Sequence, residues 1–231
     1  MFSIVIPVFN EEENIVNLTQ EIINSCKKFK SYEIVFVDDF SNDNSLQKIL
    51  KLQKKYNHIK IIKNKKNKGQ SFSIANGIEK SKYSTIITLD GDGQNNPKDI
   101  PKLIKIFNDN LNINFVGGIR QKRKDNLIKI LSSKIANSVR SKYLNDNCID
   151  TGCSLKIFEK QAFQNFPYFN GMHRFLPALF KGFGYKTTFV NVDHRKRKFG
   201  KSKYGTIDRL IRGINDMRLV KKIINEQEQN N

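Results

Sequence analysis

Residues 84–97 read STIITLDGDGQNNP, a short apolar run followed directly by acidic residues and glycines. The run over 84–89 has the length and the β-branched content of a buried strand. The strand is expected to stop at Asp90, because Asp, Gly and Asn favour turns. Pro97 suits the first turn of a helix whose apolar residues continue to Phe107. This stretch therefore predicts a strand, a polar turn and a helix, in that order.

The same order recurs on both sides of this stretch. Further strands are predicted where short apolar runs occur, at 3–8, 33–37, 59–63 and 113–119. Helices are predicted where apolar residues recur at helical spacing, over 11–29, from Ser41 or Asn42 to Leu52, and over about 70–80. Strands and helices that alternate with short joints build a mostly parallel sheet with helices on both faces. The predicted fold class is therefore α/β, with such a sheet at its centre.

After about residue 120 the pattern is looser. The predicted elements are a basic helix at about 126–143, a strand near 153–158, a helix at about 172–181 and a strand at 186–192. No linker marks a second globular domain, so residues 1–205 are predicted to form one domain with halves at about 1–119 and 120–205. An amphipathic helix over 206–225 and a disordered Gln/Asn-rich tail over 226–231 are expected to follow.

The charge of the chain is strongly positive and unevenly distributed. Its 41 Lys and Arg outnumber its 22 Asp and Glu, which gives a net charge of +19. Residues 1–100 hold 15 basic and 12 acidic residues, whereas residues 101–231 hold 26 and 10. The basic second half indicates an anionic partner: a phosphate, a nucleic acid or an acidic membrane surface.

Cysteine content and the N-terminal stretch indicate the compartment. The chain has three Cys and no CxxC pair, which excludes a disulfide-stapled scaffold and disfavours a structural zinc site. The N-terminus lacks the basic and apolar regions of a secretory signal, and no apolar run of membrane-spanning length occurs. A cytoplasmic location is therefore expected.

The acidic turn after the fourth predicted strand has the residue types of a metal site. Asp90 and Asp92 lie two residues apart, and Gln94 adds an amide oxygen. Oxygen ligands of this kind suit Mg²⁺ or Mn²⁺, which often share a diphosphate as a further ligand. A solvated acidic turn is the alternative. Neither GxxxxGK[ST] nor GxGxxG occurs, which disfavours a P-loop NTPase or an ordinary dinucleotide enzyme.

Two other polar segments also follow predicted strands. Pro7–Glu11 comes after the first strand, and Asp38–Asp39 ends the second. In open α/β sheets, ligands bind in the crevice beyond the carboxyl ends of the strands. These two segments and Asp90–Gln94 are therefore expected to meet in one crevice.

The chain contains, in this order, IVIPVFNEEENI at 4–15, IVFVDDFSNDNS at 34–45 and NKGQSFSIANGIEKSKYSTIITLDGDGQNNP at 67–97. Together these stretches resemble the family 2 inverting glycosyltransferases of the GT-A fold. With DGDGQ at 90–94 and RKFGKSKYG at 197–205, the chain looks like the dolichol-phosphate mannose synthases and their bacterial polyprenyl-phosphate relatives. The resemblance covers about residues 2–213 and implies a GT-A nucleotide-diphospho-sugar transferase fold.

The resemblance implies a donor site in the first half. The residues expected to bind the nucleotide sugar are Pro7, Phe9, Glu11, Asp39, Gln70, Asp90, Asp92 and Gln94. Among them, Asp39 is expected near the base or ribose. The trio Asp90, Asp92 and Gln94 is expected to hold Mg²⁺ or Mn²⁺ together with the donor diphosphate.

The resemblance also implies an acceptor site in the basic half. The residues expected at the acceptor phosphate are Arg120, Arg174, Arg197, Ser202 and Lys203. The predicted catalytic residues are Asp92, Arg120 and Asp150, and Asp150 resembles the proposed base of relatives that use a hydroxyl acceptor. A phosphate monoester has a second pKa of about 6, so a polyprenyl phosphate attacks without a base. Asp150 is then either catalytic or a turn residue.

The implied function is inverting transfer of a mannose- or glucose-type hexose from a nucleotide-diphosphate sugar to a dolichyl or undecaprenyl phosphate. The expected location is peripheral, on the cytoplasmic face of the inner membrane, through an anionic membrane surface or a separate membrane subunit. Transfer to a sugar hydroxyl in a cell-surface glycan is the first alternative, and it makes Asp150 an obligatory base. A nucleic-acid-binding module is the second, but no recognised motif supports it, so nucleic acid is not an expected partner.

Overall fold

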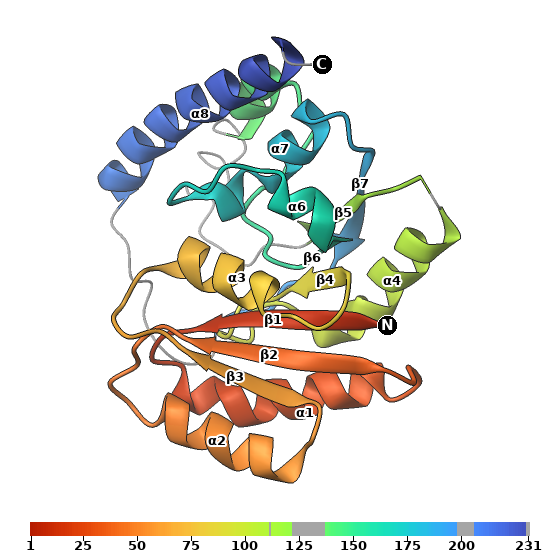
Figure 1. Cartoon of the computed structure of the whole chain (residues 1–231), viewed down its shortest axis with the longest axis vertical. Helices are drawn as coiled ribbons and strands as arrows, with labels where there is room; N and C mark the ends of the chain where they lie inside the picture. The colour runs from red at the N-terminus through yellow and green to blue at the C-terminus, as the bar shows by residue number, and fades with distance from the viewer. Residues whose placement is uncertain (111, 122–136, 198–205, 230–231) are drawn as a thin grey trace.

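The computed structural model describes residues 1–110, 112–121, 137–197 and 206–229, with the backbone alone for 206–212. Within these residues a seven-stranded sheet has the order β3-β2-β1-β4-β6-β5-β7 (Figure 1). The strands are β1 Phe2–Val8, β2 Tyr32–Asp38, β3 Ile59–Lys63, β4 Thr85–Thr88, β5 Phe115–Arg120, β6 Lys156–Glu159 and β7 Thr187–Val192. β6 runs antiparallel to β4 and β5, and the other neighbouring pairs are parallel. The predicted α/β fold with a mostly parallel sheet is confirmed.

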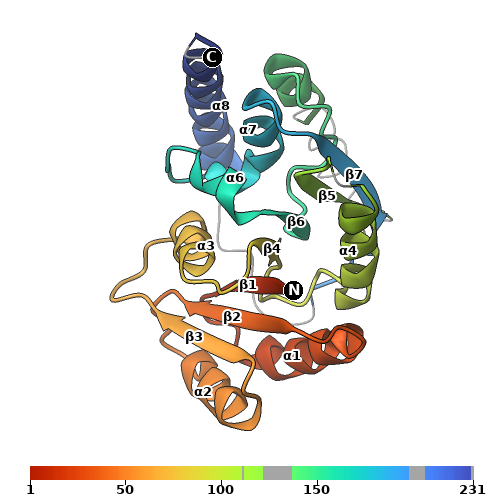
Figure 2. The ribbon, with the colours of Figure 1, turned by 45° about the vertical axis from the view of Figure 1, so that its right-hand side comes forward.

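Helices cover both faces of this sheet (Figure 2). One face carries α1 Glu12–Cys26, α2 Ser45–Lys55 and α4 Ile100–Asp109. The other carries α3 Gln70–Glu79, α6 Lys160–Gln164, α7 Leu176–Gly182 and α8 Thr206–Gln229. Short 3₁₀ turns, η1 Pro97–Asp99 and η2 Met172–Arg174, precede α4 and α7. Residues 137–144 are also helical.

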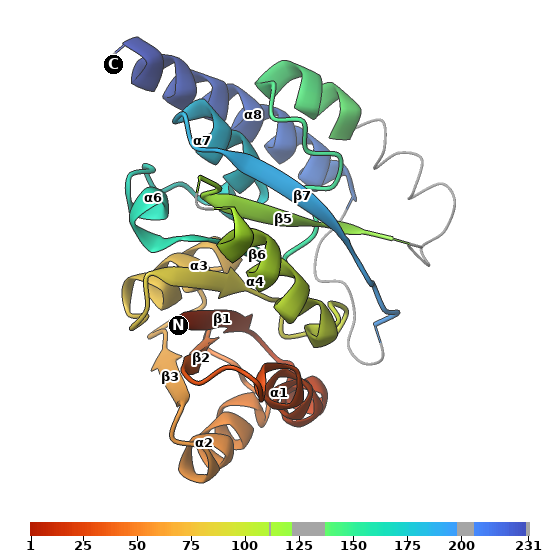
Figure 3. The ribbon, with the colours of Figure 1, turned by 90° about the vertical axis from the view of Figure 1, so that its right-hand side faces the viewer.

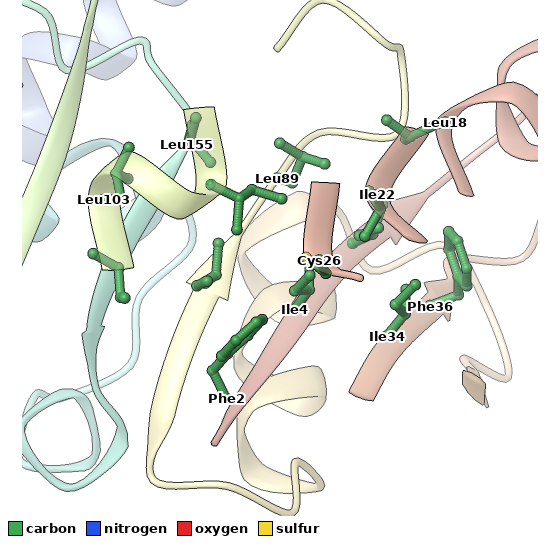
Figure 4. Close-up of a cluster of buried hydrophobic side chains, with 14 of the residues drawn as sticks. Phe2, Ile4, Leu18, Ile22, Cys26, Ile34, Phe36, Leu89, Leu103 and Leu155 are labelled. Atoms are coloured by element: carbon green, nitrogen blue, oxygen red, sulfur yellow. The ribbon is translucent and has the colours of Figure 1, made fainter. Parts of the chain in front are cut away.

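Alternate residues of the central strands enter two separate cores. Ile4 of β1 belongs to the same buried cluster as Leu18 and Ile22 of α1 (Figure 4). Ile6 of β1 belongs to this cluster as well. Val5, which lies between Ile4 and Ile6, belongs to the cluster on the opposite face with α3 and α7. This alternation follows from the pleat of a strand that is buried on both faces. The central strands are therefore packed on both faces, which fixes the positions of their ends.

The start of α2 differs from the prediction. The helix begins at Ser45 and not at Ser41 or Asn42. Asp43 accepts hydrogen bonds from the main-chain N–H groups of Ser45 and Glu12, and the Ser41 hydroxyl accepts one from the N–H of Asn10. Short polar side chains that bond to backbone groups compete with helix formation, and here they hold 41–44 as a loop against the start of α1.

The last helix is longer than predicted. α8 continues to Gln229, so the prediction of a disordered tail was wrong for residues 226–229, and residues 230–231 lie outside the described part. Glu and Gln are good helix formers, and Lys222 pairs with Glu226 one turn later at 3.6 Å. In the described part of the chain, no helix is long and apolar enough to cross a membrane.

α8 packs along α7 (Figure 3). Among the described side chains of α8, which begin at residue 213, Val220 and Ile224 are the buried apolar ones. A side chain at Gly182 of α7 would collide with Ile224. Glycine at this position therefore lets the two helices approach closely.

The direction of β6 determines where the residues that precede it lie. Lys156, the first residue of β6, pairs with Thr88 near the carboxyl end of β4. Because the two strands are antiparallel, the residues that precede β6 lie at the edge of the sheet where β4 ends. Residues 150–155 are therefore brought to the turn that begins at Asp90.

Candidate active site

The end of β1 places Glu11 at the start of α1. The Glu11 side chain is buried and accepts a hydrogen bond from Asn14 Nδ2 at 2.8 Å. Its main-chain N–H donates to the Ser45 hydroxyl at 2.8 Å, which ties this turn to the start of α2. Pro7 and Phe9 are half-buried on the same segment, and a Cβ at Gly91 would lie 3.2 Å from the Pro7 carbonyl oxygen. The β1 end and the acidic turn are therefore in close contact.

The end of β2 places Asp39 under the start of α3. The buried Asp39 carboxylate accepts hydrogen bonds from the main-chain N–H groups of Lys68 and Gly69, at 2.9 and 2.8 Å, and from Asn64 Nδ2 at 2.7 Å. Gly69 has φ +86°, which a residue with a Cβ rarely adopts. This arrangement fixes the first turn of α3 and with it the position of Gln70.

The end of β4 carries the paired carboxylates. Gln70 Nε2 donates to Asp90 Oδ1 at 2.8 Å, so two predicted donor-site residues from different segments are in contact. Burial, and then the negative charge of Asp92, raise the pKa of Asp90 to about 6. The main-chain N–H of Gln94 donates to Asp92 Oδ1 at 3.0 Å, and its side-chain Nε2 donates to the Arg195 carbonyl at 3.3 Å. Gln94 therefore orients Asp92 in this structure.

Arg197, which follows β7, contacts the carboxylates of Glu11 and Asp92. Its Nη2 lies 3.2 Å from Glu11 Oε1 and 3.1 Å from Asp92 Oδ2. The sequence predicted Arg197 at a phosphate, and the structure places it against two acids that were predicted to bind the nucleotide sugar. Ser202 and Lys203, predicted beside it, lie outside the described residues.

Arg120 and Asp150, both predicted to be catalytic, bind each other. Asp150 Oδ2 accepts hydrogen bonds from the main-chain N–H and from Nε of Arg120, at 3.0 and 2.8 Å. Asp150 Oδ1 accepts one from Arg120 Nη2 at 2.7 Å. A Cβ at residue 152 would lie 2.7 Å from Arg120 Nη2, so Gly152 leaves room for the guanidinium. Asp150 thus holds Arg120 in one orientation.

Lys156 lies near Asp90 and Asp150, although it was not among the residues predicted from the sequence. Its side chain is buried at the start of β6, where its ammonium donates to the Cys153 carbonyl. Burial lowers the pKa of Lys156, and the charges of Asp90 and Asp150 act in the opposite direction. A lysine inside an apolar run, as in LKIF at 155–158, is the signal that could have identified it.

Arg174 pairs with an acid that was not among the predicted site residues. Its Nη2 pairs with Asp216 Oδ2 at 2.5 Å, which joins η2 to α8. The neighbouring His173 forms a 2.6 Å hydrogen bond between its Nδ1 and the Ser71 hydroxyl on α3. The assignment of Arg174 to the acceptor phosphate stays a prediction.

The acidic turn fits a divalent cation. Burial, and then the negative charge of Asp92, raise the pKa of Asp90. A cation that both carboxylates bind would offset both effects. Among the described residues, no group of three or more His, Cys, Asp or Glu side chains is arranged to hold a metal ion. A cation at Asp90 and Asp92 would therefore need further oxygen ligands from elsewhere, such as a diphosphate.

A mostly parallel sheet whose strand ends gather these acids is the GT-A fold of nucleotide-sugar glycosyltransferases, and solved structures share it. The chain matches glucosyl-3-phosphoglycerate synthase from Mycobacterium tuberculosis, crystallised with Mn²⁺, UDP and phosphoglyceric acid. The TM-score is 0.72 at 13% identity, over 98% of this chain and 78% of that chain. A mannosyltransferase from Pyrobaculum calidifontis, in complex with GDP-Man and Mn²⁺, matches with a TM-score of 0.64 at 13% identity, over 87% of this chain and 58% of that chain.

The chain belongs to glycosyl transferase family 2, whose profile matches residues 3–166. Among curated proteins it is 34% identical to the undecaprenyl-phosphate 4-deoxy-4-formamido-L-arabinose transferase of Photorhabdus laumondii, over 87% of this chain and 62% of that protein. It is 33% identical to the protein of the same name from Yersinia pestis, over 93% of this chain and 65% of that protein. The chain thus spans somewhat less than two thirds of the length of these relatives.

Proposed function

We propose that this chain transfers a sugar from a nucleotide-diphosphate sugar to a polyprenyl phosphate, with inversion, in the presence of Mg²⁺ or Mn²⁺. The donor would bind at the carboxyl ends of β1, β2 and β4. The acceptor phosphate would bind at Arg120, the last residue of β5, which pairs with Asp150 from the segment before β6.

The donor half of the proposal is supported by the acids at the three strand ends. Asp39 is held by backbone N–H groups at the start of α3, where a base or ribose would contact it. Asp90, Asp92 and Gln94 are the residues that would hold the metal. When bound, a divalent cation would neutralise the charge that develops on the leaving diphosphate.

The acceptor half rests on one observation, the pairing of Arg120 with Asp150. Both carboxylate oxygens of Asp150 accept hydrogen bonds from Arg120, so the guanidinium is held in one orientation. The charge of Arg120 also acts on Asp90, where it lowers the pKa of that acid against the larger effect of burial. A guanidinium suits a phosphate acceptor, which is largely dianionic at neutral pH and attacks without a base. A hydroxyl acceptor needs a base that takes its proton, and an Asp150 engaged in this way suits that role poorly.

The identity of the transferred sugar is a separate part of the proposal, for which there are two candidate classes. The sequence suggested a mannose- or glucose-type hexose, whereas the curated relatives are named for 4-deoxy-4-formamido-L-arabinose. Both sugar classes therefore belong in the test, together with UDP- and GDP-linked donors.

A membrane surface is the proposed place of action, because the acceptor is a lipid. The net charge of +19, concentrated after residue 100, supports contact with anionic lipid headgroups. A separate membrane subunit is a second way to hold the chain there, and the cytoplasmic face is where nucleotide sugars are available.

A transfer panel tests the proposal. Purified chain is incubated with radiolabelled UDP-4-deoxy-4-formamido-L-arabinose, UDP-glucose or GDP-mannose, with Mg²⁺ or Mn²⁺, and with undecaprenyl phosphate or undecaprenol. Label is expected in the organic phase with at least one donor, and with the phosphate only. Equal transfer to undecaprenol, or transfer to soluble sugars alone, would overturn the assignment of a phosphate acceptor.

A further inference from the structure

Arg197 lies between two acids that come from different segments of the donor site. Its Nη2 is within 3.2 Å of Glu11 Oε1 and 3.1 Å of Asp92 Oδ2. The Arg197 side chain is 23% exposed, and those of Glu11 and Asp92 are 10% and 12% exposed. Ion pairs that are largely shielded from water are stronger than pairs on an open surface. Arg197 therefore neutralises these two carboxylates effectively.

The backbone brings Arg197 to this position. Asn95 and His194 form an isolated antiparallel bridge, and the N–H of Arg195 donates to the Gln94 carbonyl at 2.9 Å. The segment after β7 is thus aligned with the turn that contains Asp92. The contact of the guanidinium with Asp92 is consequently fixed by main-chain hydrogen bonds as well as by the long side chain.

We infer that Arg197 is a stand-in cation, which holds Glu11 and Asp92 in the absence of a donor and competes with a divalent metal for Asp92. The inference rests on the proposed function, since it takes Asp92 as a metal ligand. A cation held by the Asp92 carboxylate would repel the guanidinium beside Asp92 Oδ2, so Arg197 would have to move away when the metal binds. The released guanidinium then pairs with a phosphate, for which it has a suitable bidentate geometry.

The consequence is a coupling between the metal and the nucleotide. A metal that binds alone would break the ion pairs of Arg197 with Glu11 and Asp92, and Arg197 would gain no new partner. A metal that binds together with a diphosphate would bring an anion with which Arg197 can pair. Metal affinity should then depend strongly on nucleotide, and by linkage nucleotide affinity should depend equally on metal. Arg197 is in this sense a positioning residue, because it makes the acidic turn selective for a complete metal–diphosphate pair.

Binding of Mn²⁺, followed by the electron paramagnetic resonance signal of the free ion, tests this inference without turnover. The variant is Arg197→Met, and the matched control is Arg195→Met. Arg195 carries the same charge two residues away, but it pairs with Glu21 and Asn96. Without nucleotide, Arg197→Met should bind Mn²⁺ roughly tenfold more tightly than the wild type, because an ion pair on Asp92 is removed. Arg195→Met should stay within about twofold, since a more distant charge is screened.

With UDP or GDP present, the advantage of Arg197→Met should shrink or reverse, because the diphosphate has lost a cationic partner. If Arg197→Met is not folded by circular dichroism, Arg197→Gln replaces it. Equal nucleotide-free affinity in the Arg197 variant and the wild type would overturn the inference while leaving the metal site intact. Absence of Mn²⁺ binding in all variants, even with UDP or GDP, would instead refute the metal site of the proposed function and the inference with it.

Discussion

Asp150→Asn separates the two acceptor chemistries, because the two roles of Asp150 predict different kinetics. Asn keeps one oxygen, which can still accept from the main-chain N–H and Nε of Arg120. Its NH₂ group would face Arg120 Nη2, so the 2.7 Å bond to Oδ1 is lost. The loss of one charge-assisted hydrogen bond should lower the free energy of unfolding by about 1.5–3 kcal/mol.

The kinetic effect should appear mainly in the binding of the acceptor. If Asp150 orients Arg120, the KM for undecaprenyl phosphate should rise about tenfold while kcat falls less, because a binding interaction is weakened. If Asp150 were a general base, kcat would fall by about 10²–10⁴-fold. The assay is initial-rate transfer of radiolabel at varied acceptor concentration, normalised to the folded fraction.

Asp146→Asn is the matched control for this measurement. Asp146 is fully buried and pairs with Arg140, in the same half of the chain as the Asp150 pair. It should show a comparable loss of stability with unchanged KM and kcat per folded molecule. A drop of kcat beyond about 10²-fold in Asp150→Asn, with the fold preserved and the control active, would refute the orienting role and favour a hydroxyl acceptor.

Three other predictions concern the acidic turn and the charge of the chain. Asp92→Asn should lower transfer by at least about 10²-fold, and EDTA should abolish the wild-type activity; full activity in either case would exclude the metal. Because the pKa of Asp90 is raised to about 6, the neutral form of this acid is favoured in the folded state, and its contribution to stability is lost as pH rises from about 4 through 6. Asp90→Asn should therefore gain stability relative to the wild type between pH 4 and pH 7, by about 2–3 kcal/mol in chemical denaturation, and a constant difference would contradict the raised pKa. Flotation with vesicles of anionic lipid should occur at low salt and weaken at high salt, whereas salt-independent or absent flotation would argue against an electrostatic membrane contact.

The meeting of the segments that form the proposed donor site could be predicted from the sequence, because each segment follows a recognisable strand. Asp39 and Asp90 each follow a short apolar strand, and the carboxyl ends of parallel strands share one edge of the sheet. Their convergence with Glu11 and Gln70 therefore follows from the alternation of strands and helices alone. The pattern of apolar residues determines which segments are strands. The preference for right-handed crossovers then limits how these strands can be arranged in the sheet.

The contacts on the proposed acceptor side could not be predicted from the periodicity of apolar residues. An apolar run at 155–158 has the same pattern whether the strand runs parallel or antiparallel, so the position of Lys156 beside Asp90 could not be read from it. The pairing of Arg197 with Asp92 joins residues 105 positions apart. Contacts of this kind arise from the tertiary fold, and no local preference of either residue predicts them.

The placement of β6 also has a consequence for the synthesis of the chain. β6 is made after β5, yet it lies between β4 and β5 and pairs Thr85 with Glu159 and Phe115 with Phe158. A nascent chain that has not reached residue 159 therefore exposes one unpaired edge on β4 and both edges on β5, whose other neighbour β7 is made later still. Such unpaired edges favour aggregation. Neither half of the chain holds a complete sheet, so the donor and acceptor halves should fold together, late in translation, and should fail as separate fragments.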